Sequence, residues 1–144
     1  MTTSTSSTIF SARGLLAVML LAAIALSQYG PGVRPTAAAA ACEVTYVISN
    51  QWGDGFNADV TIKNNAAALS SWTLGWSFGG AQRIVNLWNG VVTQSGQAVS
   101  VANAGWNGAV ASGGSVNFGF QATYAGANAK PTTFKLNGVL CSTP

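Results

Sequence analysis

Phe56-Asn57-Ala58-Asp59-Val60-Thr61-Ile62-Lys63 is the stretch of sequence that decides the fold. Apolar and polar residues alternate strictly along it. Because successive side chains of a β-strand point to opposite faces, this period of two predicts a strand with one buried face and one exposed face.

The same alternation recurs on both sides of this stretch. Turn-forming glycines and asparagines interrupt it at roughly the 8–12-residue spacing of short strands, and no helical period occurs from residue 42 onward. Several short strands in this arrangement predict an all-β fold, an antiparallel two-sheet β-sandwich. The apolar positions of these runs are Val44, Tyr46 and Ile48; Trp72, Leu74, Trp76 and Phe78; Val99 and Val101; Val116, Phe118, Phe120, Ala122 and Tyr124; and Phe134 and Leu136.

The alternation also divides the five tryptophans into two groups. Trp72 and Trp76 fall on the apolar face of one run, so we expect them in the core. Trp52, Trp88 and Trp106 stand in turn sequences rich in glycine and asparagine, and loop backbone usually runs over the surface. One such ring could cover the core, whereas three in similar settings predict an exposed aromatic platform.

Exposed indoles on a surface of low charge favour a neutral sugar polymer as ligand. The flat face of a β-linked glucose ring presents C–H groups that pack against an aromatic face. Amides are suitable companions, because they both donate to and accept from hydroxyl groups. The amides near these loops or on outward strand positions are Asn50, Asn86, Asn117 and Gln121.

Composition argues against several other kinds of partner. The chain has 144 residues, enough for one domain, with six Lys or Arg, three Asp or Glu and no His. Two of the cations, Arg13 and Arg34, belong to the N-terminal segment, and the rest of the chain carries a net charge of +1. No basic stripe exists to neutralise phosphates, so nucleic acid is not the expected partner.

Catalysis is not expected either. The absence of histidine removes Ser-His and Cys-His mechanisms and most metal sites, so we expect no metal and no cofactor. Glycoside hydrolysis usually needs two carboxyl groups, and beyond the leader only Glu43, Asp54 and Asp59 supply them. A small secreted glycosidase that uses Asp54 and Asp59 is the enzymatic alternative.

The N-terminal segment has the features of an export signal. Arg13 precedes an apolar run of about 14 residues, 14–27, which is shorter than a membrane span, and Ala37–Ala41 offers small-residue cleavage positions. We therefore expect residues 1–41 to be a secretory signal peptide and short leader. The mature protein, 42–141, is then expected to be secreted, monomeric and without a membrane partner. The alternatives for this segment are a buried helix or a membrane anchor. A structural or adhesive surface protein with a lipid attached to Cys42 is the third functional hypothesis, beside the binding module and the glycosidase.

The only two cysteines, Cys42 and Cys141, stand at the two ends of the expected domain. In an exported protein they favour a disulfide, which would close a loop of about 100 residues and in the chain-entropy model stabilise the fold by about 4–5 kcal/mol. Two free thiols or a metal-binding pair are the alternatives, and no histidine or third cysteine is present to complete a metal site.

Six short motifs are spread over residues 42–141: Asn50-Gln-Trp-Gly-Asp-Gly-Phe56, Trp72-Thr-Leu-Gly-Trp-Ser-Phe78, Val92-Thr-Gln-Ser-Gly96, Asn103-Ala-Gly-Trp-Asn-Gly108, Gly113-Gly-Ser-Val-Asn-Phe-Gly-Phe120 and Phe134-Lys-Leu-Asn-Gly138. Through these motifs the range closely resembles the bacterial family 2 carbohydrate-binding modules. The resemblance implies a jelly-roll-like sandwich of about nine strands, a terminal disulfide, and three tryptophans that stack on crystalline cellulose, often with chitin binding as well.

Two features favour the cellulose-binding branch of that family. Its xylan-binding branch tends to lack the middle tryptophan and to carry an arginine shortly after the first, whereas this chain has Trp88 and Gly55. Asp59 and Asn86 depart from the Asn and Gln that the family can show at these positions. The family is usually joined to glycoside hydrolases by a Pro/Thr/Ser-rich linker, which this chain lacks. The alternative to a free-standing cellulose-binding protein is therefore a fragment of a secreted glycoside hydrolase that binds xylan or another β-glycan.

Overall fold

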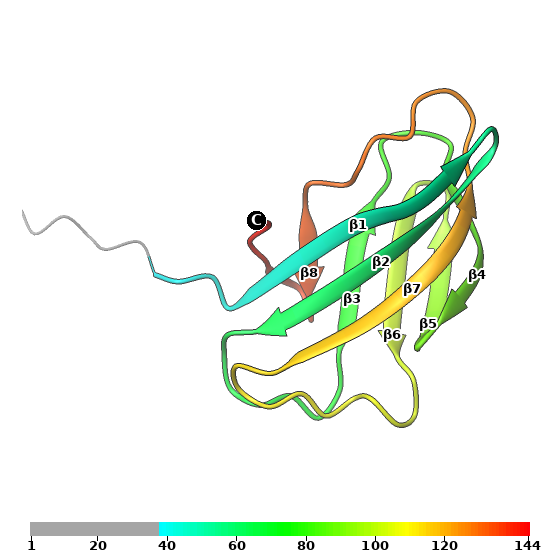
Figure 1. Ribbon diagram of the computed structural model, residues 1–144. Helices are drawn as coiled ribbons and strands as arrows, with labels where there is room; N and C mark the ends of the chain where they lie inside the picture. Colours follow the sequence, from blue (N-terminus) through cyan, green and yellow to red (C-terminus); the bar gives the residue numbers. More distant parts are fainter. Residues whose placement is uncertain (1–37) are drawn as a thin grey trace, which may run out of the picture. The chain divides into compact units, whose positions relative to one another are not determined.

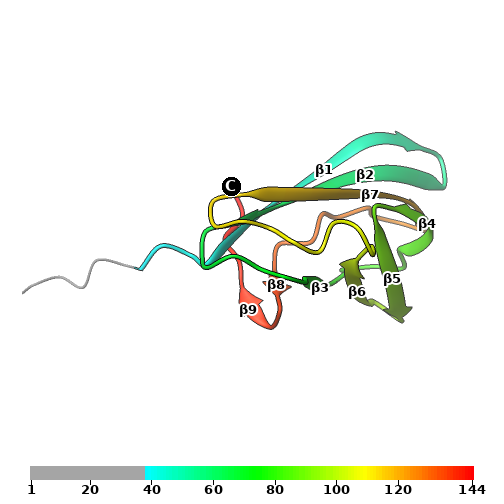
Figure 2. The ribbon, with the colours of Figure 1, turned by 90° about the horizontal axis from the view of Figure 1, so that it is seen from below.

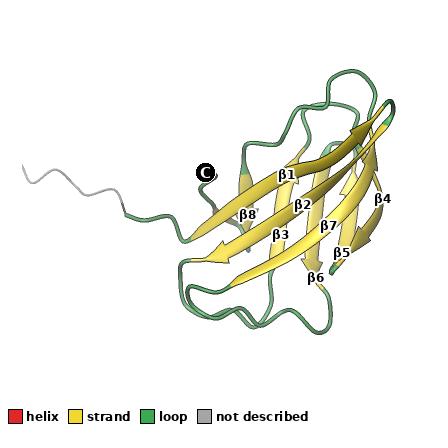
Figure 3. Cartoon of the chain, viewed as in Figure 1, coloured by secondary structure: helices red, strands yellow, loops and turns green. Residues whose placement is uncertain are grey.

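Two antiparallel sheets face each other in the computed structural model, which describes residues 38–144 (Figures 1 and 2). The predicted β-sandwich is confirmed, and every regular element of the described part is a strand (Figure 3). One sheet has the order β1 (Cys42–Trp52), β2 (Gly55–Asn64), β7 (Ser115–Thr123), β4 (Arg83–Trp88). The other has the order β5 (Gly90–Ser95), β6 (Ala98–Asn103), β3 (Thr73–Ser77), β8 (Phe134–Leu136), β9 (Val139–Leu140).

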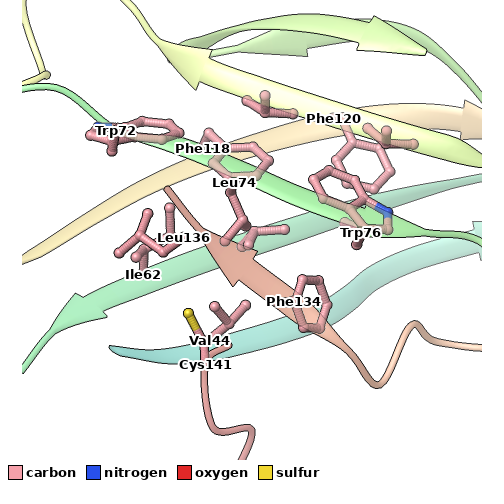
Figure 4. Close-up of a cluster of buried hydrophobic side chains, with 14 of the residues drawn as sticks. Val44, Ile62, Trp72, Leu74, Trp76, Phe118, Phe120, Phe134, Leu136 and Cys141 are labelled. Atoms are coloured by element: carbon pink, nitrogen blue, oxygen red, sulfur yellow. The ribbon is translucent and has the colours of Figure 1, made fainter. Parts of the chain in front are cut away.

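The core lies between the sheets and is built on aromatic stacking (Figure 4). Trp72 stacks on Phe118 with ring centroids 5.8 Å apart, and Trp76 stacks on Phe118 and Phe120 at 6.2 and 6.0 Å. Both tryptophans are at most 5% exposed, as the alternation predicts. Burial of such large rings is the main favourable term in the stability of a domain of this size.

Three of the nine strands in residues 38–144 show no clear alternation of apolar and polar residue types, and each has a physical reason. In β4 the register shifts between Ile84 and Asn86, so the inward residues Ile84 and Leu87 stand three apart. Such a bulge inserts one extra residue into a strand and breaks its alternation. The strand β5 is an edge strand whose inward positions include the polar Gln94, and β9 has only two residues.

The side chain of Gln94 links the two sheets where they come together at β4 and β5. Its Oε1 accepts from the backbone N–H of Ile84 (2.9 Å), and its Nε2 donates to the carbonyl of Gln82 (2.8 Å). At the opposite end of β4, Asn89 has a φ of 64° and turns the chain from one sheet into the other. These contacts hold β4 at the edge of its sheet and so position the side chains that β4 presents outward.

Cys42 and Cys141 form the predicted disulfide, across a sequence separation of 99 residues. It is flanked by backbone hydrogen bonds, because the N–H of Ser142 donates to the carbonyl of Cys42 (2.9 Å) and the N–H of Val44 donates to that of Ser142 (2.8 Å). The described part contains no free thiol, so the free-thiol and metal-pair alternatives do not describe this structure. The predicted leader falls almost wholly on residues 1–37, which lie outside the described residues.

Candidate functional site

The outward side of the sheet β1-β2-β7-β4 carries most of the predicted site, and we call it the platform face. Strand pairing arranges its residues in rows that run across the sheet. In the first row, Trp52 of β1 pairs with Gly55 of β2, and Gly55 pairs with Thr123 of β7. Thr123 in turn pairs with Arg83 of β4. The first tryptophan and one cation therefore stand at opposite ends of one row.

The second row of the platform face consists entirely of amide side chains. Asn50 pairs with Asn57, Asn57 pairs with Gln121, and Gln121 pairs with Asn86. Three of these residues belong to the predicted site and are brought into one line. Asn57 was not predicted as a site residue, because the sequence alternation places it outward but does not show which residues face it across the strands.

The third row contains the second tryptophan. Trp88 pairs with Gly119, Gly119 pairs with Asp59, and Asp59 pairs with Val47. Asn117 precedes Gly119 by two residues on β7, so it lies on the same face but on the far side of this row from the amides. The structure therefore separates Asn117 from the other three predicted amides.

Two of the tryptophan rings lie directly over glycines of the neighbouring strand. A Cβ built on Gly55 would meet atoms of the Trp52 indole at 2.6 Å, and one on Gly119 would meet the Trp88 indole at 2.4 Å. Both glycines are buried although they belong to the outward set, because the rings cover them. Each indole is therefore in contact with the sheet on one side, while 38% of Trp52 and 40% of Trp88 remains exposed.

The prediction that Trp52 and Trp88 stand in turns needs correction. They are the last residues of β1 and β4, and only the residues that follow them form turns. The glycines and asparagines that surround them are typical of loops, but Gly55 opens β2 as the cross-strand partner of Trp52. Exposure of both rings was predicted correctly.

The third tryptophan, Trp106, is held differently. It lies in the loop between β6 and β7 and is 73% exposed. The next residue, Asn107, is buried and fixes the loop, since its Nδ2 donates to the carbonyl of Asn89 (2.8 Å) and its carbonyl accepts from Nε1 of Trp72 (2.8 Å). Because Asn89 follows Trp88, this contact connects the loop of the third ring to the strand of the second.

The hairpin that carries Trp52 is also fixed by hydrogen bonds. Tyr124 Oη donates to the carbonyl of Trp52 (3.0 Å) and accepts from Nε2 of Gln51 (2.9 Å). The backbone N–H of Tyr124 donates to the carbonyl of Asp54 in the turn (3.0 Å). The first ring is thus attached to a braced hairpin.

The spacing of the two seated rings follows from the strand register. Gly55 pairs with Thr123, and Gly119 lies four residues before Thr123 on β7. At about 3.3 Å per residue the two rows are about 13 Å apart, and Asn50, Asn57, Gln121 and Asn86 lie between them. This distance leaves room for more than one sugar ring.

The amide row between Trp52 and Trp88 contains no charged side chain, whereas the first row ends at Arg83 and the third row includes Asp59. None of Trp52, Trp88 and Trp106 borders the three hollows of the described part, although Arg83 at the end of the first row lines one of them. Residues 38–144 contain no group of three or more His, Cys, Asp or Glu side chains that could hold a metal ion. In the same range, no helix is long and apolar enough to cross a bilayer.

A disulfide-closed β-sandwich with indoles and amides on one outer face is what the resemblance to carbohydrate-binding modules led us to expect. A family model described as cellulose binding domain matches residues 42–141. The chain belongs to this family, the family 2 carbohydrate-binding modules.

Individual relatives agree with the family match. The chain is 48% identical over 102 residues to exoglucanase A of Cellulomonas fimi. The aligned residues make up 70% of this chain and 12% of the exoglucanase. Among solved structures, the chitin-binding domain of Chi18aC from Streptomyces coelicolor is similar with a TM-score of 0.58 and 37% identity, over 70% of this chain and 94% of that domain. The cellulose-binding family 2 domain from ScLPMO10C gives a TM-score of 0.54 and 31% identity, over 73% and 98%.

The chain spans only a small part of the curated enzymes it matches, namely 12, 24 and 19% of the first three. What these whole enzymes do is therefore not transferred from the match itself.

Proposed function

We propose that this chain is a non-catalytic module that binds crystalline cellulose through the platform face and Trp106. The observation that carries the proposal is the seating of Trp52 and Trp88 on Gly55 and Gly119, with a row of amides between them. An indole with one side on a glycine keeps its other side free for a ligand. Two such rings on one outer face suit the flat surface of a packed polymer.

The expected binding chemistry is stacking supplemented by hydrogen bonds. The C–H groups of a glucose ring pack on the free side of each indole through dispersion. The amides of Asn50, Asn57, Gln121 and Asn86 both donate to and accept from the sugar hydroxyls between the two rings. Because rigid rings lose little conformational entropy, several modest contacts to one repetitive polymer reinforce each other.

Cellulose is preferred over xylan in this proposal because of two residues. Trp88 is present, and Gly55 leaves the Trp52 ring free to lie on the sheet, whereas any larger residue there would meet the ring at 2.6 Å. Chitin is a second candidate polymer, because a solved chitin-binding domain is 37% identical to this chain. Chitin shares the flat β-1,4-linked backbone on which the stacking depends.

The carboxyl groups support a role without catalysis. Asp54 lies in the turn before Gly55, and Asp59 stands four residues after Gly55 on β2, about 13 Å along the strand. Glycoside hydrolases hold their two carboxyl groups roughly 5–10 Å apart on either side of the scissile bond. The enzymatic alternative is tested by the release of reducing sugar, which should be absent and should not depend on Asp54.

The test of the proposal is adsorption of residues 38–144 to microcrystalline cellulose. The wild-type domain should leave the supernatant at low and at high salt, because stacking on a neutral polymer is not screened. The triple variant Trp52→Ala, Trp88→Ala, Trp106→Ala should stay in the supernatant while its far-UV circular dichroism is unchanged. A wild-type domain that stays in solution, or a triple variant that still adsorbs, contradicts the proposal.

We further propose that residues 1–41 are removed on export, that the mature module is a secreted monomer, and that it can form part of a longer glycoside hydrolase. The resemblance to exoglucanase A supports this last point. Mass spectrometry of the protein recovered from culture medium tests the cleavage and distinguishes a disulfide-bonded Cys42 from a lipidated one. Size-exclusion chromatography tests the monomer.

A further inference from the structure

Gly119 is an unusual choice of residue for the centre of a long strand. Glycine weakens a strand, and it is needed where the backbone adopts a positive φ or where another group approaches closely. The glycines with positive φ are Gly96, Gly113, Gly126 and Gly138, and Gly119 is not among them. The backbone would therefore accept an alanine at position 119, and the reason for glycine must be a neighbouring group.

That neighbour is the indole of Trp88. A Cβ on Gly119 would stand 2.4 Å from Cε2 and Cζ2 and 2.5 Å from Nε1 of Trp88, and no other residue is among its three nearest atoms. Carbon atoms in contact prefer a separation of about 3.5–4.0 Å, so the ring would have to move by more than about 1 Å. Rotation of the ring about its side-chain bonds, away from the sheet, would provide this distance and would tilt the free side of the ring.

We infer that Gly119 is a positioning residue that holds the indole of Trp88 parallel to the platform face and so selects flat polymer surfaces. This inference rests on the proposed cellulose binding. It extends the site to a residue that makes no contact with the polymer itself. The free side of a parallel ring meets a planar surface fully, whereas a tilted ring meets it along an edge.

The contact between Gly119 and the indole of Trp88 can be tested without any ligand. In the wild-type protein an α-proton of Gly119 points at the indole face of Trp88, where ring currents shield it, so its NMR resonance should be shifted upfield. Replacement of Trp88 by Ala should return this resonance to an ordinary position. A Gly119 α-proton without an upfield shift in the wild type contradicts the inference, whether or not the protein binds cellulose.

The consequence for binding is tested with Gly119→Ala. If the Trp88 ring no longer stacks fully on the polymer, adsorption to microcrystalline cellulose should weaken by roughly three- to ten-fold. The circular dichroism and the unfolding midpoint should be unchanged. The matched control is Gly79→Ala, since nothing lies within 4 Å of a Cβ at that position. It should adsorb like the wild type, and equal losses in both variants would contradict the inference.

A double-mutant cycle separates positioning from a general structural effect. If Gly119 acts only through Trp88, Gly119→Ala should change adsorption by less than about two-fold in a Trp88→Ala background. A full additional loss in that background would show that Gly119 acts in another way. If the wild type itself fails to adsorb, the proposed function fails, while the NMR result still decides whether Gly119 seats the ring.

Discussion

The two faces of strand β7 carry tryptophans in opposite ways. On the inner face, Phe118 is stacked against both Trp72 and Trp76, so those rings are enclosed on all sides (Figure 4). On the outer face, the very next residue, Gly119, lies beneath Trp88 and leaves the other side of that ring free. The same type of side chain is thus buried or left partly exposed according to the residue beneath it, and the partly exposed arrangement is the one that the proposed recognition requires.

The largest expected loss of stability comes from removing a tryptophan that stacks on the inner face of β7. Trp72→Ala removes a ring that is 1% exposed and stacks on Phe118. It should lower the free energy of unfolding by about 3–5 kcal/mol, because a cavity replaces a large buried side chain. Denaturant titration measures the change. A loss below about 1 kcal/mol would mean that Trp72 is not part of the core.

Asn107 connects the buried Trp72 to Asn89, the residue after the exposed Trp88. Its replacement by Asp should have the next largest effect on stability. The change turns the donor that meets the carbonyl of Asn89 into an acceptor and buries a charge. We expect a loss of about 2–3 kcal/mol in the free energy of unfolding. Adsorption should also weaken, since the loop of Trp106 loses its attachment. Asn117→Asp, at an exposed position, is the control for stability and should change it little.

Alkaline pH tests the inner face alone. Burial raises the pKa of Tyr46, which packs against Phe120 and Phe134, well above its ordinary value. The phenol therefore stays neutral in the folded state and ionises first in the unfolded state, above about pH 10. Stability should be complete below that pH and fall above it, by about 1 kcal/mol near pH 11. Tyr46→Phe should flatten this fall, and equal slopes in both proteins would contradict the assignment.

The smallest effect on stability is expected on the outer side. Trp106→Ala removes a ring that is 73% exposed, so the free energy of unfolding should change by less than about 0.5 kcal/mol. Adsorption to cellulose should nevertheless weaken measurably. Thermal unfolding and a binding isotherm on the same sample separate the two. A marked loss of stability would show that Trp106 packs against the fold.

Much of this contrast was predictable from the alternation of residues. The period of two assigned Trp72 and Trp76 to the core and left Trp52, Trp88 and Trp106 exposed, as the structure has them. The pairing of the two cysteines was also predicted. The burial of Trp72 and Trp76 depends on which face of a strand a residue occupies, and the disulfide depends on the positions of the only two cysteines; the sequence contains both directly.

The features of the site that the sequence did not predict depend on which residues face each other on neighbouring strands. That Gly119 lies beneath Trp88, or that Asn57 belongs to the amide row, follows from the register of β7 against β4 and β2. The bulge in β4 added to the difficulty, because it moves Asn86 into that row and breaks the period that would have revealed the strand. Register between distant strands is set by packing of the whole sandwich and is not visible in any single stretch.

The position of the disulfide has a mechanical consequence. Cys42 and Cys141 join the chain where it enters and leaves the sandwich, with their Cα atoms 4.7 Å apart, and Trp52 stands at the other end of β1. A pulling force between the segments on either side of this bond passes through the sulfur atoms and bypasses the strands between them. Tension transmitted from one of these segments to the other would therefore leave the strands between the two cysteines unloaded.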